Sequence, residues 1–104
     1  MKIVKPSVEI LTPINGEKIL NHIETIARTC YQSQPRDSSH KLVKSLINSK
    51  HFAMLEHYNI SVKFITDRGV SHEIVRHRLA SFAQESTRYC NYSKDKFGNE
   101  ISVV

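Results

Sequence analysis

Residues 59–67, with the sequence NISVKFITD, alternate apolar and polar side chains in the middle of the chain. Ile60, Val62 and Phe64 fall on one side of an extended backbone, because successive side chains of a strand point to opposite faces. The segments before and after this run carry helical periodicity instead. A strand with one well-buried face between helical segments predicts an α+β fold, in which helices pack on an antiparallel sheet.

The segments before this strand predict two helices. Residues 17–31 hold apolar side chains at helical spacing, which forms one stripe for packing against a core. The members of this stripe are Ile19, Leu20, Ile23, Ile26, Ala27 and Cys30. The polar loop that follows contains Pro35, and Asp37 or Ser38 can cap the next helix. That second helix, HKLVKSLINSKH, is expected to end near Ser49.

Two shorter elements complete the pattern around these helices. Residues 2–11 are mostly alternating and β-branched and end at the turn cluster TPING, which predicts an opening strand. A short helix is expected to begin after Asp67 or Ser71 and to run into the arginines at positions 76–78.

The last residues, ISVV, form a strand-like run after a turn at residues 97–99. No partner strand follows this run, and an unpaired apolar edge is unfavourable in a finished fold. The chain shows no internal repeat or linker-like stretch that would divide it. We therefore expect residues 1–104 to form a single partial domain, the N-terminal part of a longer protein.

The charge of the chain favours negatively charged partners. Fifteen lysines and arginines against ten aspartates and glutamates give a net charge of +5, which suits nucleotides, nucleic acids and phosphorylated cofactors. The 39% of hydrophobic residues is typical of a globular protein. Cys30 and Cys90 lie far apart without disulfide or metal-binding spacing, which predicts a cytoplasmic location. No signal peptide or membrane-spanning run is expected.

The densest group of anion-binding side chains is RHRLASFAQESTRY, residues 76–89. On a helix Arg76 and Arg78 would diverge, so they suit the two ends of a large anion such as a dinucleotide. The STRY segment adds two hydroxyl groups and Arg88, a set suited to a phosphate monoester. Arginines near a helix C-terminus are also common on solvated surfaces.

A small basic nucleic-acid-binding module, using the arginines on phosphates, is the alternative function. The lysines are scattered through both predicted helices, whereas the arginines concentrate at one short site. Because nucleic-acid binders usually spread their charge along a stripe, this distribution argues against nucleic acid as the partner.

Several segments together resemble the flavin-dependent thymidylate synthases. RHR at positions 76–78, followed by Ser86, resembles the signature of that family, and HFAMLEHYNISVKF, GVSHEIVRHR and STRYCNYSK resemble its neighbouring segments in the same order. Nearly the whole chain thus resembles the N-terminal half of the family. The resemblance implies methylation of dUMP to dTMP, with methylenetetrahydrofolate as carbon donor and FAD, reduced by NADPH, as hydride source.

The resemblance also implies a role for individual residues near the cofactor. Arg76, His77 and Arg78 would contact FAD, and Arg76 would also lie near the nucleotide substrate. His51 would lie close to the flavin and the folate as a catalytic residue. Glu56 is a second candidate for flavin contact.

The residues that the resemblance implies for dUMP binding are Glu73, Arg76, Gln84, Glu85, Ser86, Thr87 and Arg88. Ser86 would activate the substrate through a hydrogen bond and not as a covalent nucleophile, because no base is adjacent to it in the sequence. Gln84 is also a flavin candidate. Many family members read Asn-Glu where this chain has Ala83-Gln84, so an amide replaces a carboxylate here.

No histidine of the chain is expected to bind a metal ion. His51 and His57 bracket FAMLE without a third ligand nearby, so no metal site is expected. His22, His40 and His72 are expected to be solvated helix residues.

The resemblance implies a homotetramer whose active site combines residues of several subunits. Family members are considerably longer than this chain, and their other half supplies further flavin contacts and an arginine that activates dUMP. The chain alone is therefore expected to be inactive.

Overall fold

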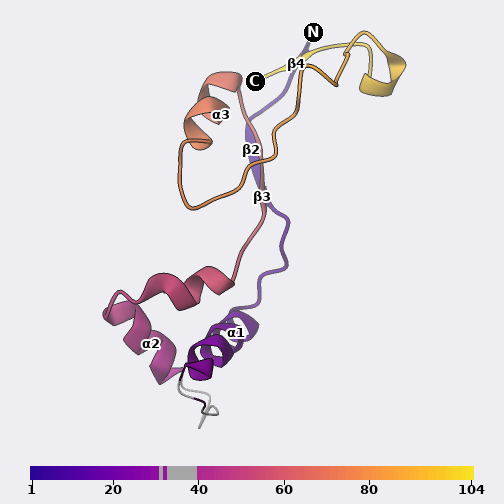
Figure 1. Cartoon of the computed structure of the whole chain (residues 1–104). Coiled ribbons are helices and arrows are strands. Elements are labelled where there is room, and N and C mark those ends of the chain that lie inside the picture. Colours follow the sequence, from indigo (N-terminus) through magenta and orange to yellow (C-terminus); the bar gives the residue numbers. More distant parts are fainter. Residues whose placement is uncertain (31, 33–39) are drawn as a thin grey trace. The chain divides into compact units, whose positions relative to one another are not determined.

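The computed structural model describes residues 1–30, 32 and 40–104, and it contains helices and short strands (Figure 1). This mixture confirms the α+β class. The described chain separates into two compact units. Unit 1 comprises Met1–Glu9 and Lys63–Val104, and unit 2 comprises Ile10–Val62.

Unit 2 is built from α1 (Gly16–Thr29), α2 (Lys41–Asn48) and the 3-10 helix η1 (Phe52–His57). The side chain of Asn15 caps α1 by accepting a hydrogen bond of 3.1 Å from the backbone N–H of Lys18. Such a cap satisfies one of the N–H groups that the first helical turn leaves unpaired. Both helices predicted before the central strand are thereby confirmed.

The start of α2 differs from the expectation. His40 occupies the N-cap position with a left-handed backbone, φ 53°, and its side chain makes no capping hydrogen bond. The two residues expected to cap this helix, Asp37 and Ser38, lie outside the described residues.

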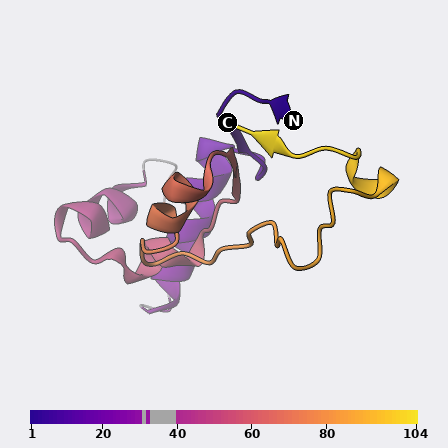
Figure 2. The same ribbon diagram turned by 90° about the horizontal axis from the view of Figure 1, so that it is seen from above.

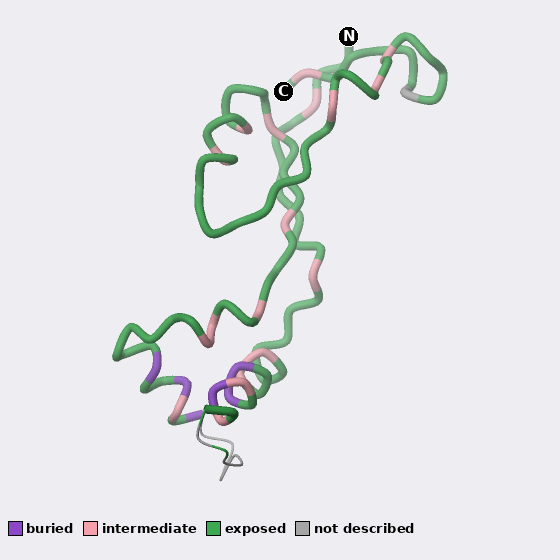
Figure 3. Tube along the Cα trace, in the orientation of Figure 1, coloured by how far each residue is buried: buried purple, intermediate pink, exposed green. Residues whose placement is uncertain are grey.

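The core of unit 2 lies between α1 and α2, where Figure 3 shows the buried segments. Its buried apolar residues are Ile23, Ala27, Val43 and Leu46. Both helices also pack against η1. The predicted stripe of α1 is confirmed at Ile23 and Ala27, but it is wrong at Cys30, which is exposed because α1 ends before it.

The strands form two-stranded sheets. β1 (Lys2–Ile3) pairs in parallel with β4 (Ser102–Val103), so the ends of the chain lie side by side in Figures 1 and 2. The final run was expected to be an unpaired edge because no partner strand follows it; this is wrong, because the opening strand is its partner. The expectation of helices packed on an antiparallel sheet is wrong in two respects: this pair is parallel, and in unit 2 the helices α1 and α2 pack on each other and on η1.

The opening strand is divided into β1 and β2 (Ser7–Ile10) by residues 4–6. Pro6 lies in the break, where a residue without a backbone N–H cannot continue a ladder. β2 pairs with β3 (Val62–Ile65). The N–H of Leu11 donates to the carbonyl of Ser61 at 2.8 Å, so the end of β2 lies beside the start of β3, the antiparallel arrangement.

The central strand is confirmed as β3, but its predicted buried face is wrong. Phe64 is 53% exposed, and Ile60, which precedes the strand, is also exposed. The physical reason is the width of the sheet, because a two-stranded ribbon provides little surface on which other elements can pack.

The helix before the arginines is confirmed as α3 (Arg68–Ile74), and its cap is Asp67. The Asp67 carboxylate accepts a hydrogen bond of 2.9 Å from the N–H of Val70. The predicted turn near the end is present, with Gly98 at φ 78° after η2 (Asp95–Phe97). Among the described residues, no helix has the length and apolar character needed to cross a membrane.

Candidate functional site

The arginine motif of unit 1 begins where α3 ends. The N–H of Arg76 donates to the carbonyl of Glu73 at 3.2 Å, and the N–H of His77 donates to that of Ile74 at 3.0 Å. These bonds form a turn, and Arg78 follows it in the loop. The expectation that the short helix leads into the arginines is confirmed, since α3 ends at Ile74 and the motif occupies the turn and the loop directly after it.

A hydrogen bond between two side chains fastens the next part of the loop to α3. The amide nitrogen of Gln84 donates to the hydroxyl oxygen of Ser71 at 2.8 Å. Ser71 donates its own hydroxyl hydrogen to the carbonyl of Arg68 at 3.0 Å, so its oxygen is left to accept. The amide of Gln84 can donate an N–H to this oxygen, whereas an ionised carboxylate at position 84 would have no hydrogen to donate.

Ser86 organises the turn that follows Gln84. Its hydroxyl oxygen accepts from the N–H of Arg88 at 3.2 Å, and its carbonyl accepts from the N–H groups of Tyr89 and Cys90. Glu85 accepts a hydrogen bond from the hydroxyl of Tyr92. Ser86 is half-buried, and its hydroxyl hydrogen is donated to no acceptor within the described part of the chain.

The guanidinium groups of this segment are open to a ligand. Arg76, Arg78 and Arg88 are exposed, and none of them forms an ion pair with another residue of 1–30, 32 or 40–104. Glu73 and Thr87 are exposed as well. A planar guanidinium without a carboxylate partner can bind phosphate oxygens with two parallel hydrogen bonds.

The other candidate residues belong to unit 2, where an open hollow of about 450 Å³ lies beside η1. Its lining residues are Ala27, Cys30, Leu46, Lys50, His51, Phe52, Ala53 and Met54. The backbone N–H of His51 donates to the carbonyl of Leu46 at 2.9 Å, which fixes the chain at this point. Glu56 is exposed on η1 and does not line the hollow.

The structure thus gathers the predicted residues in two places. Glu73, Arg76 to Arg78 and residues 84–88 belong to unit 1, and His51 and Glu56 belong to unit 2. No group of three or more histidine, cysteine, aspartate or glutamate side chains with a geometry for a metal ion is found in the described ranges.

A family model described as "Thymidylate synthase complementing protein" matches residues 16–103. The chain belongs to this family. The match includes the hollow around His51 and the whole arginine motif. The family that the sequence motifs resemble is thereby confirmed.

Curated relatives of this thymidylate synthase complementing family member carry the name flavin-dependent thymidylate synthase. The relative from Mycolicibacterium gilvum is 38% identical over 91 residues, which cover 81% of this chain and 35% of the relative. Those from Mycobacterium avium and Mycobacterium tuberculosis are 36% and 35% identical over the same shares. The chain therefore spans about a third of the length of these relatives. No solved structure matches it.

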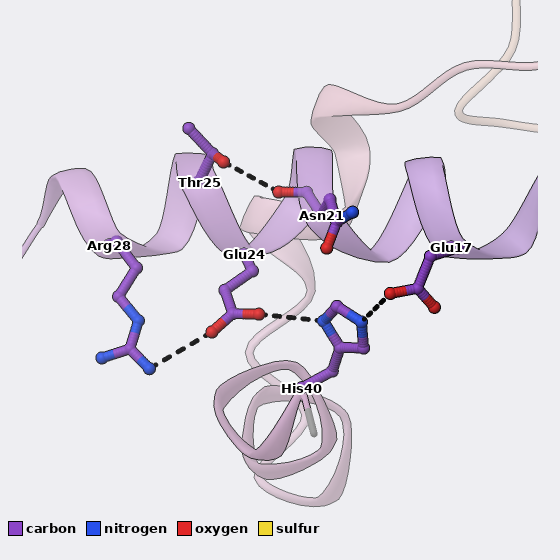
Figure 4. Close-up of polar contacts among 6 residues, drawn as sticks. All are labelled: Glu17, Asn21, Glu24, Thr25, Arg28 and His40. Atoms are coloured by element: carbon purple, nitrogen blue, oxygen red, sulfur yellow. Dashed lines mark hydrogen bonds and ion pairs between the residues drawn. The ribbon is translucent and has the colours of Figure 1, made fainter. Parts of the chain in front are cut away.

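One polar cluster of this family member was missed by the sequence interpretation. His40 is buried, whereas it was expected to be solvated, and its ring contacts the carboxylates of Glu17 and Glu24 on α1 (Figure 4). The hydrogen bond to Glu17, followed by that to Glu24, raises the pKa of His40 above its ordinary value of 6.5. His22 and His72 are exposed, as expected.

A signal for this cluster is present in the sequence. Glu24 lies between Ile23 and Ala27 and follows Leu20 by one helical turn, so it falls on the apolar stripe of α1. A carboxylate in that position needs a partner when the stripe is buried. His40 begins the helix that covers the stripe.

Proposed function

We propose that this chain is part of a flavin-dependent thymidylate synthase, an enzyme that methylates dUMP to dTMP with methylenetetrahydrofolate as carbon donor. Bound FAD, reduced by NADPH, would supply the hydride. The observation that carries the proposal is the family match over residues 16–103. We further propose that both compact units belong to one partial domain, because the match runs through both.

Arg76, His77 and Arg78 would hold the FAD. Their exposed side chains follow one another in the turn and loop after α3, and the two guanidinium groups have no carboxylate partner among the described residues. Charge-assisted hydrogen bonds from arginine to a diphosphate are stronger than neutral ones. Because neither guanidinium group is paired with a described carboxylate, both are available to the two negatively charged ends of one large anion.

The segment from Gln84 to Arg88 would bind dUMP. The turn at Ser86 places the Arg88 backbone next to its hydroxyl group, and the hydroxyl hydrogen is left to donate to the nucleotide. Thr87 and Glu85 complete this segment, and Glu73, one turn before Arg76, would face the base. Ser86 has no basic side chain within hydrogen-bond distance among the described residues, which favours a binding role over a covalent one.

His51 would contact the ring of the flavin or the folate. It lines the hollow together with Phe52 and Met54, side chains that suit a flat heterocycle. The exposed position of Glu56 outside the hollow gives it a smaller part in this contact. In this proposal the complete enzyme is a homotetramer that combines residues of several subunits.

FAD binding to the purified chain tests the proposal. We expect weak, saturable binding by flavin fluorescence anisotropy, and we expect an Arg76→Ala, Arg78→Ala double variant to bind at least tenfold more weakly, since each contact to a charged group contributes about 1.5–3 kcal/mol. Arg68→Ala is the matched control, because Arg68 is an exposed arginine on α3, outside the motif that follows this helix. Equal affinity in all three proteins, with salt-dependent retention on heparin, would instead favour a nucleic-acid-binding module.

A further inference from the structure

His40 joins the first residues of α2 to α1 through both nitrogens of its ring (Figure 4). Its Nδ1 lies 2.9 Å from a carboxylate oxygen of Glu24, and its Nε2 lies 3.0 Å from one of Glu17. The His40 and Glu24 side chains are only 6% and 4% exposed, whereas that of Glu17 is 63% exposed. The contact is therefore buried on one side of the ring and open to solvent on the other.

Both contacts can be hydrogen bonds only in one protonation state. A neutral imidazole carries a single N–H, so its second nitrogen would present a lone pair to a carboxylate oxygen. The imidazolium form carries an N–H at both nitrogens and donates to both carboxylates. Loss of the proton must weaken one contact, and the solvated Glu17 is the partner that water can replace.

Among the described residues, no charged group other than Glu17 and Glu24 forms a hydrogen bond or ion pair with the ring. Arg28 on α1 donates a hydrogen bond of 3.2 Å to a carboxylate oxygen of Glu24 and not to the ring. Lys41 and Lys44, on the helix that His40 begins, are exposed and form no ion pair with another described residue. Glu56 and His57 of η1 are also exposed, and neither contacts the His40 ring in the described structure.

The two helices that His40 joins also line the hollow around His51. α1 contributes Ala27 and α2 contributes Leu46, after which the chain continues directly into the lining residues 50–54. α2 is a helix of eight residues, so fixing its first turn against α1 constrains its last turn. The position of the lining therefore depends on the contact at His40.

We propose that protonated His40 is a pH-dependent clamp between α1 and α2 that positions the hollow around His51. His40 is thus a positioning residue, because it acts through the helices and does not itself line the hollow. The clamp rests on the contacts of unit 2 alone, and only the identity of the ring that enters the hollow rests on the proposed function.

The direction of the pH dependence follows from the raised pKa of His40. A group with a higher pKa in the folded state stabilises that state fully below its unfolded value, here 6.5, and this contribution is lost as the pH rises through the folded value. The clamp should therefore be closed at pH 6.0 and released at alkaline pH.

Methionine methyl NMR can follow the hollow directly. Met1 and Met54 are the only methionines of the chain, and Met54 lines the hollow. We expect the Met54 methyl signal to shift with pH at the same midpoint as the ring protons of His40, above 6.5. The His40→Gln variant, which keeps His51 in the lining, identifies the part of the Met54 shift that depends on His40.

In His40→Gln the phase of the Met54 titration that follows His40 should disappear. In Glu17→Gln the midpoints of His40 and Met54 should both move down toward 6.5, and the exposed position of Glu17 keeps this second variant informative if His40→Gln does not fold. Glu9→Gln, an exposed carboxylate of unit 1, is the control and should leave both midpoints unchanged. The clamp would be overturned if the Met54 methyl signal did not change as His40 titrates, or if Glu17→Gln left the His40 midpoint unchanged.

FAD titrations at pH 6.0 and pH 8.5 extend the test to the ligand. Tighter binding at pH 6.0 in the wild-type chain, with a smaller pH effect in Glu17→Gln, is the expected result. If FAD bound at neither pH while the Met54 methyl signal still shifted with the His40 titration, the proposed function would be contradicted and the clamp would remain supported. Binding with the same pH effect in both proteins would contradict the coupling of the clamp to the hollow.

Discussion

Single side chains fix the places where the helices of this protein begin. Asn15 and Asp67 each accept a hydrogen bond from a backbone N–H in the first turn of the helix that follows. His40 holds the same position at the start of α2, but its side chain turns to the carboxylates of α1 instead. α2 therefore begins through a tertiary contact and not through a local cap.

Asn15→Ala should destabilise unit 2 by about 1 kcal/mol, because it leaves an N–H of the first turn of α1 without its partner. Urea unfolding followed by far-UV circular dichroism measures this change. Asn21→Ala is the matched control, because Asn21 is an exposed residue within the same helix, where alanine is favoured. Equal loss of stability in both variants would show that the Asn15 cap does not contribute.

Ser86→Ala and Arg88→Ala should weaken dUMP binding more than FAD binding, because the turn at Ser86 is proposed to bind the phosphate monoester. Loss of the Arg88 contact should lower the affinity roughly tenfold or more, as expected for about 1.5–3 kcal/mol. Isothermal titration with dUMP and with FAD separates the two ligands. If both affinities fell equally, the division between Arg76 to Arg78 and residues 84–88 would be wrong.

The sequence predicted Asp67 as the start of α3 but did not predict the role of His40, and the difference has a physical reason. Asp67 acts on a backbone group three residues away, so its effect follows from local spacing. The partners of His40 lie 16 and 23 residues away on another helix. The one sign of that contact in the sequence is the position of Glu24 on the apolar stripe of α1.

At the scale of elements, helices were predictable and strand partners were not. The apolar stripes of α1 and α2 repeat within a few residues, so periodicity alone indicates them. β4 pairs with β1, at the opposite end of the sequence. Nothing in the short run Ile101–Val104 specifies that partner, because backbone hydrogen bonds in a ladder carry little sequence information.

Packing of α2 against α1 gives a prediction for the core. Leu46→Ala should destabilise unit 2 by about 2 kcal/mol or more, because it removes a buried side chain from the contact between the helices. Urea unfolding by circular dichroism is again the measurement. Ile47→Ala changes the next residue, which is exposed, and should have little effect. A similar cost for both would mean that α2 presents a different face to α1.

At the scale of the whole molecule, the candidate residues are distributed over two compact units, and the chain covers 35% of the length of its relatives. Large apolar residues are exposed in both units, among them Val8, Phe64 and Leu79 in unit 1 and Ile14 and Phe52 in unit 2.

The family could be predicted because its motifs are short and ordered in the sequence. The arrangement of a complete site could not, since residues beyond this chain are proposed to contribute to it.

We expect the purified chain to show no thymidylate synthesis by itself. Release of tritium from labelled dUMP, with NADPH, FAD and methylenetetrahydrofolate present, measures this activity. Addition of the part of the Mycolicibacterium gilvum relative that follows its aligned segment should raise the release above that of either polypeptide alone. Turnover by the short chain alone would contradict the expectation.

The parallel pairing of β1 with β4 has a practical consequence for recombinant work. Because both strands run in the same direction, Met1 lies beside Glu100, with its amine 3.2 Å from that carboxylate, while Val4 donates to Val103 at the other end of the pair. A purification tag fused before Met1 would convert the amine into an amide and remove this ion pair. A tag fused after Val104 would leave from the opposite end of the ladder and keep the amine intact.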